Sequence, residues 1–170
     1  MTRLFVIEVN EKFGFIDPKG KVIIEPEFEN VLSTYFSEGL CPIEERELCG
    51  YIDEKGSIVI APQYDSVTDF SNGLAAVSKD GLWGYIDKHN RIVIPFSFDS
   101  AYGFSDDGLA TVEQNGKLGY INKSGLFEID PMFDEAYDFD GELAKIEKDE
   151  KFGYIDRQGN IVWMQLGKSD

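Results

Sequence analysis

Residues 83–94 read WGYIDKHNRIVI, and this segment recurs along the chain in recognisable form. Its central phrase is Gly-(Phe/Tyr)-Ile-(Asp/Asn), which occurs five times at intervals of 34 to 36 residues. The copies begin at Gly14, Gly50, Gly84, Gly119 and Gly153. Self-similarity at a fixed period of this length is typical of repeat architectures, in which each copy is one supersecondary unit. The sequence therefore predicts a single domain, residues 1–170, built from five tandem units.

Each unit carries the signal for a β-hairpin. Three positions after the Asp or Asn of the phrase stands a residue that tolerates positive φ. These residues are Gly20, Gly56, Asn90, Gly125 and Gly159. Asp at the start and Gly or Asn at the end are what a type I turn closed by a left-handed residue requires. Because β-branched runs such as residues 58–60 and 92–94 follow, the phrase and the run are expected to pair as two strands.

A third strand is expected before each hairpin. Similar apolar segments occupy residues 4–7, 40–43, 74–77, 109–112 and 143–146. Asp80-Gly81 and Asn115-Gly116, which separate two of these segments from the phrase, are strong two-residue hairpin signals. Each unit is thus predicted to be a three-stranded antiparallel meander.

The predicted fold is all-β, with five tandem antiparallel three-stranded meanders in an open, solenoid-like stack. Propeller-like closure is the alternative, although a propeller blade has four strands and this unit is expected to have three. Four prolines, Pro26, Pro62, Pro95 and Pro131, are expected to end the third strand of their units, because proline lacks a backbone donor.

The connections between units contain pairs of aromatic residues. We expect each pair to be buried between neighbouring meanders and to hold them together. The pairs are Phe28 and Phe36, Tyr64 and Phe70, Phe98 and Phe104, and Phe133 and Phe139.

The unit resembles the WG repeat (KWG type) of bacterial proteins. Residues 83–87 (WGYID) form the fullest copy, and residues 70–75 (FSNGLA) supply a second hallmark. The signature tryptophan column reads Phe13, Cys49, Trp83, Leu118 and Phe152, so this position requires apolar bulk beside a glycine. The resemblance spans roughly residues 4–163. It implies a β-repeat used for interaction and implies neither a reaction nor shared catalytic residues.

The charge excludes several classes of partner. The chain has 32 Asp and Glu against 16 Lys and Arg, a net charge of −16. Phosphates would be repelled, so we expect no nucleic-acid and no anionic-membrane partner. The apolar run near the N-terminus, residues 4–7, is too short for a secretory signal, and two cysteines are too few for a disulfide scaffold. These features favour a cytoplasmic protein.

Catalytic chemistry finds little support among the residues. The single histidine, His89, is expected in an exposed turn, and Cys41 and Cys49 are expected to be small buried apolar residues. Recurrent Asp residues at the turn positions are explained by the turns, and residues 138–142 lack the ligand spacing of a calcium loop. We expect no catalytic residue, no metal site and no cofactor.

One feature exceeds what folding alone requires. Residues 128–150 contain ten acids and two lysines, a charge of 2 − 10 = −8. Acids and aromatics in the connections are expected to share one side of the stack. The candidate binding residues are Asp106, Asp107, Asp134, Glu135, Tyr137, Asp138, Asp140 and Glu142, with Tyr102 nearby. The acidic face is predicted either to solubilise a β-rich protein or to dock a basic partner.

Three functions follow as hypotheses. The first is a non-enzymatic protein-binding module, in its most concrete form an acidic immunity protein that neutralises a basic toxin or effector. The second is a structural or scaffolding repeat protein that associates with itself. The third, a hydrolase based on carboxylates, would require two acids of perturbed pKa in a cleft.

Overall fold

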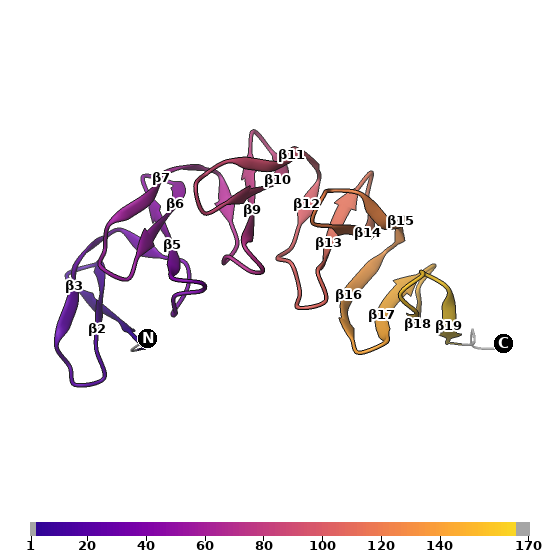
Figure 1. Cartoon of the computed structure of the whole chain (residues 1–170), viewed down its shortest axis with the longest axis horizontal. Coiled ribbons are helices and arrows are strands. Elements are labelled where there is room, and N and C mark those ends of the chain that lie inside the picture. Colours follow the sequence, from indigo (N-terminus) through magenta and orange to yellow (C-terminus); the bar gives the residue numbers. More distant parts are fainter. Residues whose placement is uncertain (1–2, 166–170) are drawn as a thin grey trace.

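The computed structural model describes residues 3–165, which form five antiparallel β-sheets in chain order (Figure 1). The first sheet contains β1 (Phe5–Val9), β2 (Lys12–Ile16) and β3 (Val22–Phe28). The second contains β4 (Asn30–Val31), β5 (Leu40–Glu45), β6 (Leu48–Asp53) and β7 (Ile58–Tyr64). The third contains β8 (Ser66–Val67), β9 (Leu74–Lys79), β10 (Leu82–Asp87) and β11 (Ile92–Phe98). The fourth contains β12 (Ser100–Ala101), β13 (Leu109–Gln114), β14 (Lys117–Asn122) and β15 (Phe127–Phe133). The fifth contains β16 (Glu135–Asp140), β17 (Leu143–Lys148), β18 (Lys151–Ile155) and β19 (Ile161–Met164).

The prediction of tandem antiparallel repeats in an open stack is confirmed. Figure 1 shows the five sheets side by side along an arc, with the two ends of the chain at opposite ends of that arc. Strands β9 and β13 lie toward the concave side, and β11 and β15 lie toward the convex side. The expected meander is present in every sheet, because strands that follow one another in the sequence are paired.

Four sheets gain a fourth strand from the connection that precedes the meander. Strands β4, β8 and β12 have two residues each, whereas β16 has six. Four strands is the number found in a propeller blade. The strand count therefore does not distinguish an open stack from a propeller, and the open arc itself does.

The apolar core lies between the sheets. Four clusters of buried side chains each combine residues of two consecutive sheets. In one cluster, Tyr85 and Ile94 of the third sheet pack with Phe104 and Ile121 of the fourth. Since successive side chains of a strand point to opposite faces, the tyrosine of the phrase in the second to fourth sheets faces the next sheet, and the isoleucine faces the previous one.

The aromatic residue of the phrase makes a recurrent contact with the next unit. Its ring packs on the second aromatic of the following connection, which confirms that residue as a tie between units. The ring centroids are separated by 4.9 Å in Phe15–Phe36, 4.8 Å in Tyr51–Phe70, 5.0 Å in Tyr85–Phe104 and 5.2 Å in Tyr120–Phe139. In three units the phenolic hydroxyl also donates a hydrogen bond to a backbone carbonyl of that connection, as from Tyr85 to Tyr102 at 2.8 Å.

In the first four sheets, the glycine of the phrase lies opposite a bulge in the last strand of the meander. In the fourth sheet Leu118 pairs with Phe133 and Tyr120 pairs with Ile129. Residues 130–132 of β15 therefore form a bulge opposite Gly119. A Cβ atom at Gly119 would lie 2.7 Å from the carbonyl oxygen of Ile129. Only glycine permits this approach of the two backbones.

The prolines lie inside these bulges, so the expectation that they end the strands is wrong. Pro26, Pro62, Pro95 and Pro131 all fall within β3, β7, β11 and β15, which continue for two or three further residues. Each of these strands is at the outer edge of its sheet, where a missing backbone donor leaves no partner unpaired.

The turn acids are explained by the turns, as expected. In every unit the Oδ1 atom of the Asp or Asn accepts hydrogen bonds from the backbone N–H groups two and four residues later. The residue that closes each of these turns has a positive φ, from 62° at Asn90 to 84° at Gly56. These side chains hold the hairpins.

Replacing Gly119 by Ala is expected to lower the free energy of unfolding by at least about 2 kcal/mol, because backbone atoms of β15 would have to move. Gly103→Ala is the control, since an added Cβ there would meet only Ser71 at 3.8 Å. Urea denaturation of the two variants measures the difference. Equal stability would contradict the bulge as the reason for the glycine.

Replacing Tyr85 by Phe is expected to lower the free energy of unfolding by about 1 kcal/mol, because the Tyr102 carbonyl loses its donor. Tyr154→Phe in the last unit should cost close to nothing, since Tyr154 is 42% exposed whereas Tyr85 is 0% exposed. The same denaturation measurement compares them. A matching loss in both variants would show that the hydroxyl does not act between units.

Candidate functional site

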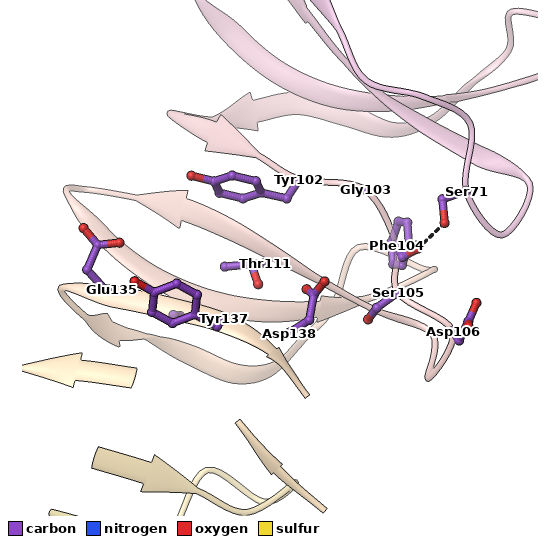
Figure 2. Close-up of a pocket in the computed structure, with 11 residues that line it drawn as sticks. Ser71, Tyr102, Gly103, Phe104, Ser105, Asp106, Thr111, Glu135, Tyr137 and Asp138 are labelled. Carbon is purple, nitrogen blue, oxygen red and sulfur yellow. Dashed lines mark hydrogen bonds between the residues drawn. The ribbon is translucent and has the colours of Figure 1, made fainter. Parts of the chain in front are cut away.

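A groove of about 660 Å³ lies between the fourth and fifth sheets, where β12 and β16 approach the concave side of the arc (Figures 1 and 2). Its walls come from the connection after β12, from β13 and from β16. The lining residues are Ser71, Tyr102, Gly103, Phe104, Ser105, Asp106, Thr111, Glu135, Ala136, Tyr137 and Asp138.

The pairing of β16 explains why its side chains line the groove. Ala136 pairs with Ile146, and the next pair is Phe139 with Ala144. The two residues between them, Tyr137 and Asp138, are thus in an irregular segment of the strand. Such irregularities redirect side chains, and both of these lie along the groove in Figure 2.

Two exposed tyrosines flank the groove. Tyr102 is 54% exposed and Tyr137 is 48% exposed, and they come from different sheets. Their backbones are held by the buried tyrosines of the preceding units, because Tyr85 donates to the Tyr102 carbonyl at 2.8 Å and Tyr120 to the Tyr137 carbonyl at 2.7 Å. The contact that joins the units therefore also positions the aromatic walls.

Thr111 contributes a buried hydroxyl to the groove. The residue is 3% exposed, and its Oγ1 atom has no hydrogen-bond partner within residues 3–165. Thr111 pairs with Tyr120 across the strands, and the equivalent positions in the other four units hold Val6, Pro42, Ala76 and Lys145. Since the repeat accepts residues without a hydroxyl here, the fold does not require the hydroxyl of Thr111.

Three carboxylates give the groove a negative charge. Asp106, Glu135 and Asp138 line it, and the described residues of its lining include no lysine or arginine. Partial loss of water around the Asp138 carboxyl, together with the negative charge of Asp107, raises the pKa of Asp138 above its ordinary value. A cation in the groove would relieve this repulsion.

The eight candidate binding residues from the sequence do not all lie at the groove. Four of them line the groove: Asp106, Glu135, Tyr137 and Asp138. Asp140 ends β16 and Glu142 lies in the turn after it, and neither is part of the lining. The acids are therefore not one continuous functional face.

Asp107 and Asp134 are engaged by the chain itself. Asp107 is 3.0 Å from the Arg157 guanidinium, and it accepts hydrogen bonds from the Ser105 hydroxyl and the Leu109 N–H. Partial burial alone would raise the pKa of the Asp107 carboxyl. The two hydrogen bonds and the ion pair outweigh burial, so the pKa of Asp107 is lowered. Asp134 pairs with Lys117, which lowers the pKa of Asp134.

Thr111 and Ser105 are lining residues that the sequence does not single out. The one available signal is that Thr111 puts a hydroxyl in a column otherwise filled by Val, Pro, Ala and Lys. Its lack of a partner depends on the space between two sheets, which no local pattern encodes.

The other residues considered from the sequence are placed as expected. His89 is exposed in the turn after β10. Cys41 and Cys49 are free and buried, and burial of the Cys41 thiol raises its pKa to about 12.

Within residues 3–165, no three His, Cys, Asp or Glu side chains come together in a way that could hold a metal ion. The same part of the chain has no helix that is long and apolar enough to cross a membrane.

Asp138→Asn is expected to raise the free energy of unfolding at neutral pH. A pKa raised above 3.8 means that the folded state holds the proton more tightly than the unfolded chain, so stability falls as pH rises from 3.8 through the folded pKa. Asparagine avoids this loss. Denaturation from acid to neutral pH should show the variant gaining on the wild type as pH rises.

The control for this prediction has the opposite sign. The pKa of Asp107 is lowered, so its ionisation stabilises the fold and that stability disappears as pH falls through the folded pKa. Asp107→Asn should therefore be less stable than the wild type at neutral pH and converge with it in acid. Parallel pH profiles for the two variants would contradict the assignment of Asp138.

Solved structures share the fold at low sequence identity. One titled "KlHsv2 with loop 6CD replaced by a Gly-Ser linker" has a TM-score of 0.63 and 11% identity, over 98% of this chain and 66% of that one. "Structure of Kluyveromyces lactis Hsv2p" has a TM-score of 0.60 and 12% identity, over 92% and 59%. "Crystal structure of the eukaryotic initiation factor" has a TM-score of 0.64 and 10% identity, over 97% and 52%. The chain thus spans about half to two thirds of these structures, which are of β-propeller type.

No curated protein sequence matches this chain. The family described as "WG containing repeat" matches four consecutive segments, residues 13–49, 50–83, 83–117 and 119–152. Each segment begins beside the glycine of one phrase, so it covers the last two strands of one sheet and the first two strands of the next. The resemblance seen in the sequence is confirmed, and the chain belongs to the WG containing repeat family.

Proposed function

We propose that this repeat domain is a non-enzymatic protein-binding module whose concave side engages a basic protein. The observation that carries the proposal is the groove between the fourth and fifth sheets. There, two exposed tyrosines and three acids come together, and the described lining residues include no lysine or arginine. Large aromatic side chains supply much of the binding energy of protein interfaces, and complementary charge accelerates association.

The surroundings of the groove support the same class of partner. Residues 128–150 carry a charge of −8, half of the total of −16. Most of this segment forms β16, β17 and the turns beside them, so the negative field is concentrated on the fifth sheet. A field of this kind attracts a cationic protein before contact is made.

The positions and burial of His89 and Cys41, the side chains most suited to catalysis, favour a binding role over a catalytic one. His89 is exposed in a turn, away from the groove lining, and the Cys41 thiol is buried with a raised pKa. Neither is arranged as a nucleophile or a general base, which must be held within hydrogen-bond reach of the group it serves.

In its most concrete form the proposal is an immunity protein, a cytoplasmic inhibitor that covers the basic site of a toxin or effector. A surplus of negative charge on a small protein suits this task, because a cationic active site is neutralised by an acidic surface that fits over it. A partner with such a site would place a basic side chain in the groove.

The test is a pull-down from lysate of the native host at low and moderate salt. The variant Asp106→Asn/Glu135→Gln/Asp138→Asn removes the charge of the groove, and Glu25→Gln/Glu27→Gln/Asp130→Asn removes the same charge from the outer strands β3 and β15. A basic protein should be captured by the wild type and by the outer-strand variant. The groove variant should bind it about tenfold or more weakly.

Equal capture by all three proteins would overturn the proposal, and the acids would then serve solubility. Sedimentation velocity on the same samples tests the scaffold hypothesis. That hypothesis is favoured by one observation, the 42% exposure of Tyr154 on the last sheet, where its counterparts in the second to fourth units are 0–1% exposed. Concentration-dependent assembly without a basic partner would favour it.

A further inference from the structure

The unpaired hydroxyl of Thr111 indicates that something outside the chain completes the groove. A buried polar group without a hydrogen bond is unfavourable and rare in folded proteins. Thr111 is 3% exposed and lines the groove, and its Oγ1 atom has no hydrogen-bond partner within residues 3–165. The equivalent residue of the third unit is Ala76, which has no hydroxyl. A bound ligand with a hydrogen-bonding group beside Thr111 would satisfy the hydroxyl.

A comparison with the other units shows what is special about the acids of this groove. The residue before the second aromatic of each connection is Asp138 here, Gly103 one unit earlier and Asp69 two units earlier. The Asp69 Oδ2 atom lies 3.4 Å from the Ser33 hydroxyl, and a hydrogen bond from Tyr35 to Asp69 raises the pKa of Tyr35. Although Asp69 keeps one unpaired oxygen, the chain provides it with donors. Within residues 3–165, Asp138 has no such donor in a hydrogen bond or ion pair.

The fifth unit shows what kind of group belongs beside these tyrosines. Lys145 occupies the position equivalent to Thr111, and its ammonium nitrogen lies 5.5 Å from the ring centre of Tyr137 and 4.6 Å from that of Phe152. The fifth unit thus places its own cation over an aromatic ring at this position. In the fourth unit the short side chain of Thr111 leaves the equivalent position beside Tyr102 without a cation.

Another contact within the chain favours arginine as the cation. The Arg157 guanidinium lies 4.9 Å from the ring centre of Phe139, donates to Asp107 at 3.0 Å and donates to the Gly141 carbonyl at 2.7 Å. A guanidinium is planar, so it stacks on a ring while its N–H groups reach acceptors around its edge. The groove offers the same combination of flat rings and oxygen acceptors.

We infer that the groove between the fourth and fifth sheets is a receptor for an arginine side chain of the basic partner. The guanidinium lies against the ring of Tyr102, the one of the two tyrosines that has no cation of its own within residues 3–165, and its N–H groups donate to the carboxylates of Asp138 and Glu135 and to the Thr111 hydroxyl (Figure 2). The inference rests on the proposed function only in taking the partner to be a basic protein. It adds the residue that is recognised and the place where it binds.

The first test uses small probes and the full chain. N-acetyl-arginine methylamide, N-acetyl-lysine methylamide and glucose are titrated separately, and the NMR signals of the Thr111 methyl group and of the Tyr102 and Tyr137 rings are followed. The arginine probe should shift these signals and bind about three- to tenfold more tightly than the lysine probe, which has the same charge. Glucose should leave them unchanged.

The second test uses variants whose stability is measured alongside binding. Thr111→Val keeps the shape and removes a hydroxyl that has no partner within residues 3–165, so thermal stability should be equal or higher while arginine binding weakens about threefold or more. Tyr102→Leu should weaken binding about fivefold. Tyr35→Leu is the matched control, because Tyr35 is 49% exposed but contacts Asp69 in a different part of the stack.

The outcomes separate this inference from the proposed function. Equal binding of the two cationic probes, stronger binding of glucose, binding of no probe, or an unchanged affinity in Tyr102→Leu would each overturn the arginine receptor. If a basic protein were still captured through the groove acids, the proposed function would stand alone. If the arginine probe bound as expected and no basic protein were captured, the receptor would stand and the proposed function would fail.

Discussion

The ring of the Gly-Tyr-Ile phrase, seated against an aromatic residue of the following connection, is the contact on which the rest of this structure depends. No sheet of three or four short strands can bury its own apolar face. Each sheet becomes stable by covering its neighbour, and the ring pairs Tyr51–Phe70 and Tyr85–Phe104 recur at every such boundary. The hydroxyl then fixes the backbone of the connection. The groove between the fourth and fifth sheets inherits its geometry from this contact.

The acids of the chain are not equivalent, although the composition counts them alike. Turn acids such as Asp87 hold the hairpins through backbone N–H groups. Others join consecutive units, because Glu38 pairs with Lys88 and Asp107 pairs with Arg157 over the same sequence distance of 50 residues. The acids of the groove have neither duty. A charge of −16 therefore overstates what is available to a partner.

The repeat and its hairpins can be predicted from the sequence because their signals are local. Alternating side chains, a turn Asp and a residue of positive φ such as Gly56 act within a few positions of one another. Strand β16 could not be predicted, because residues 135–140 become a strand only by pairing with β17, and the charges of that segment resemble a loop. The prediction that the prolines end their strands failed for a similar reason, because a bulge can be recognised only once the partner strand is placed.

The candidate site was predictable in part. Clustered charge indicated Glu135 and Asp138, which line the groove, but the same criterion included Asp134, whose partner Lys117 is 17 residues away and comes close only in the fold. Thr111 was missed because its significance is an unmet hydrogen bond between sheets. Local patterns identify groups that can act, whereas tertiary contacts decide which of them are already engaged.

The four separate cores have a thermodynamic consequence for the groove. In a linear array, each unit is stabilised by its nearest neighbours, and the end units have only one. The fifth sheet, which provides β16 as one wall of the groove, is such an end unit of the described arc. Any ligand that bridges the two walls therefore stabilises the packing of the fifth sheet on the fourth. Ligand binding in the groove and the local stability of the fifth sheet are thus thermodynamically coupled. Amide hydrogen exchange in β17 and β18 would therefore slow when the groove is occupied, although these strands do not line it.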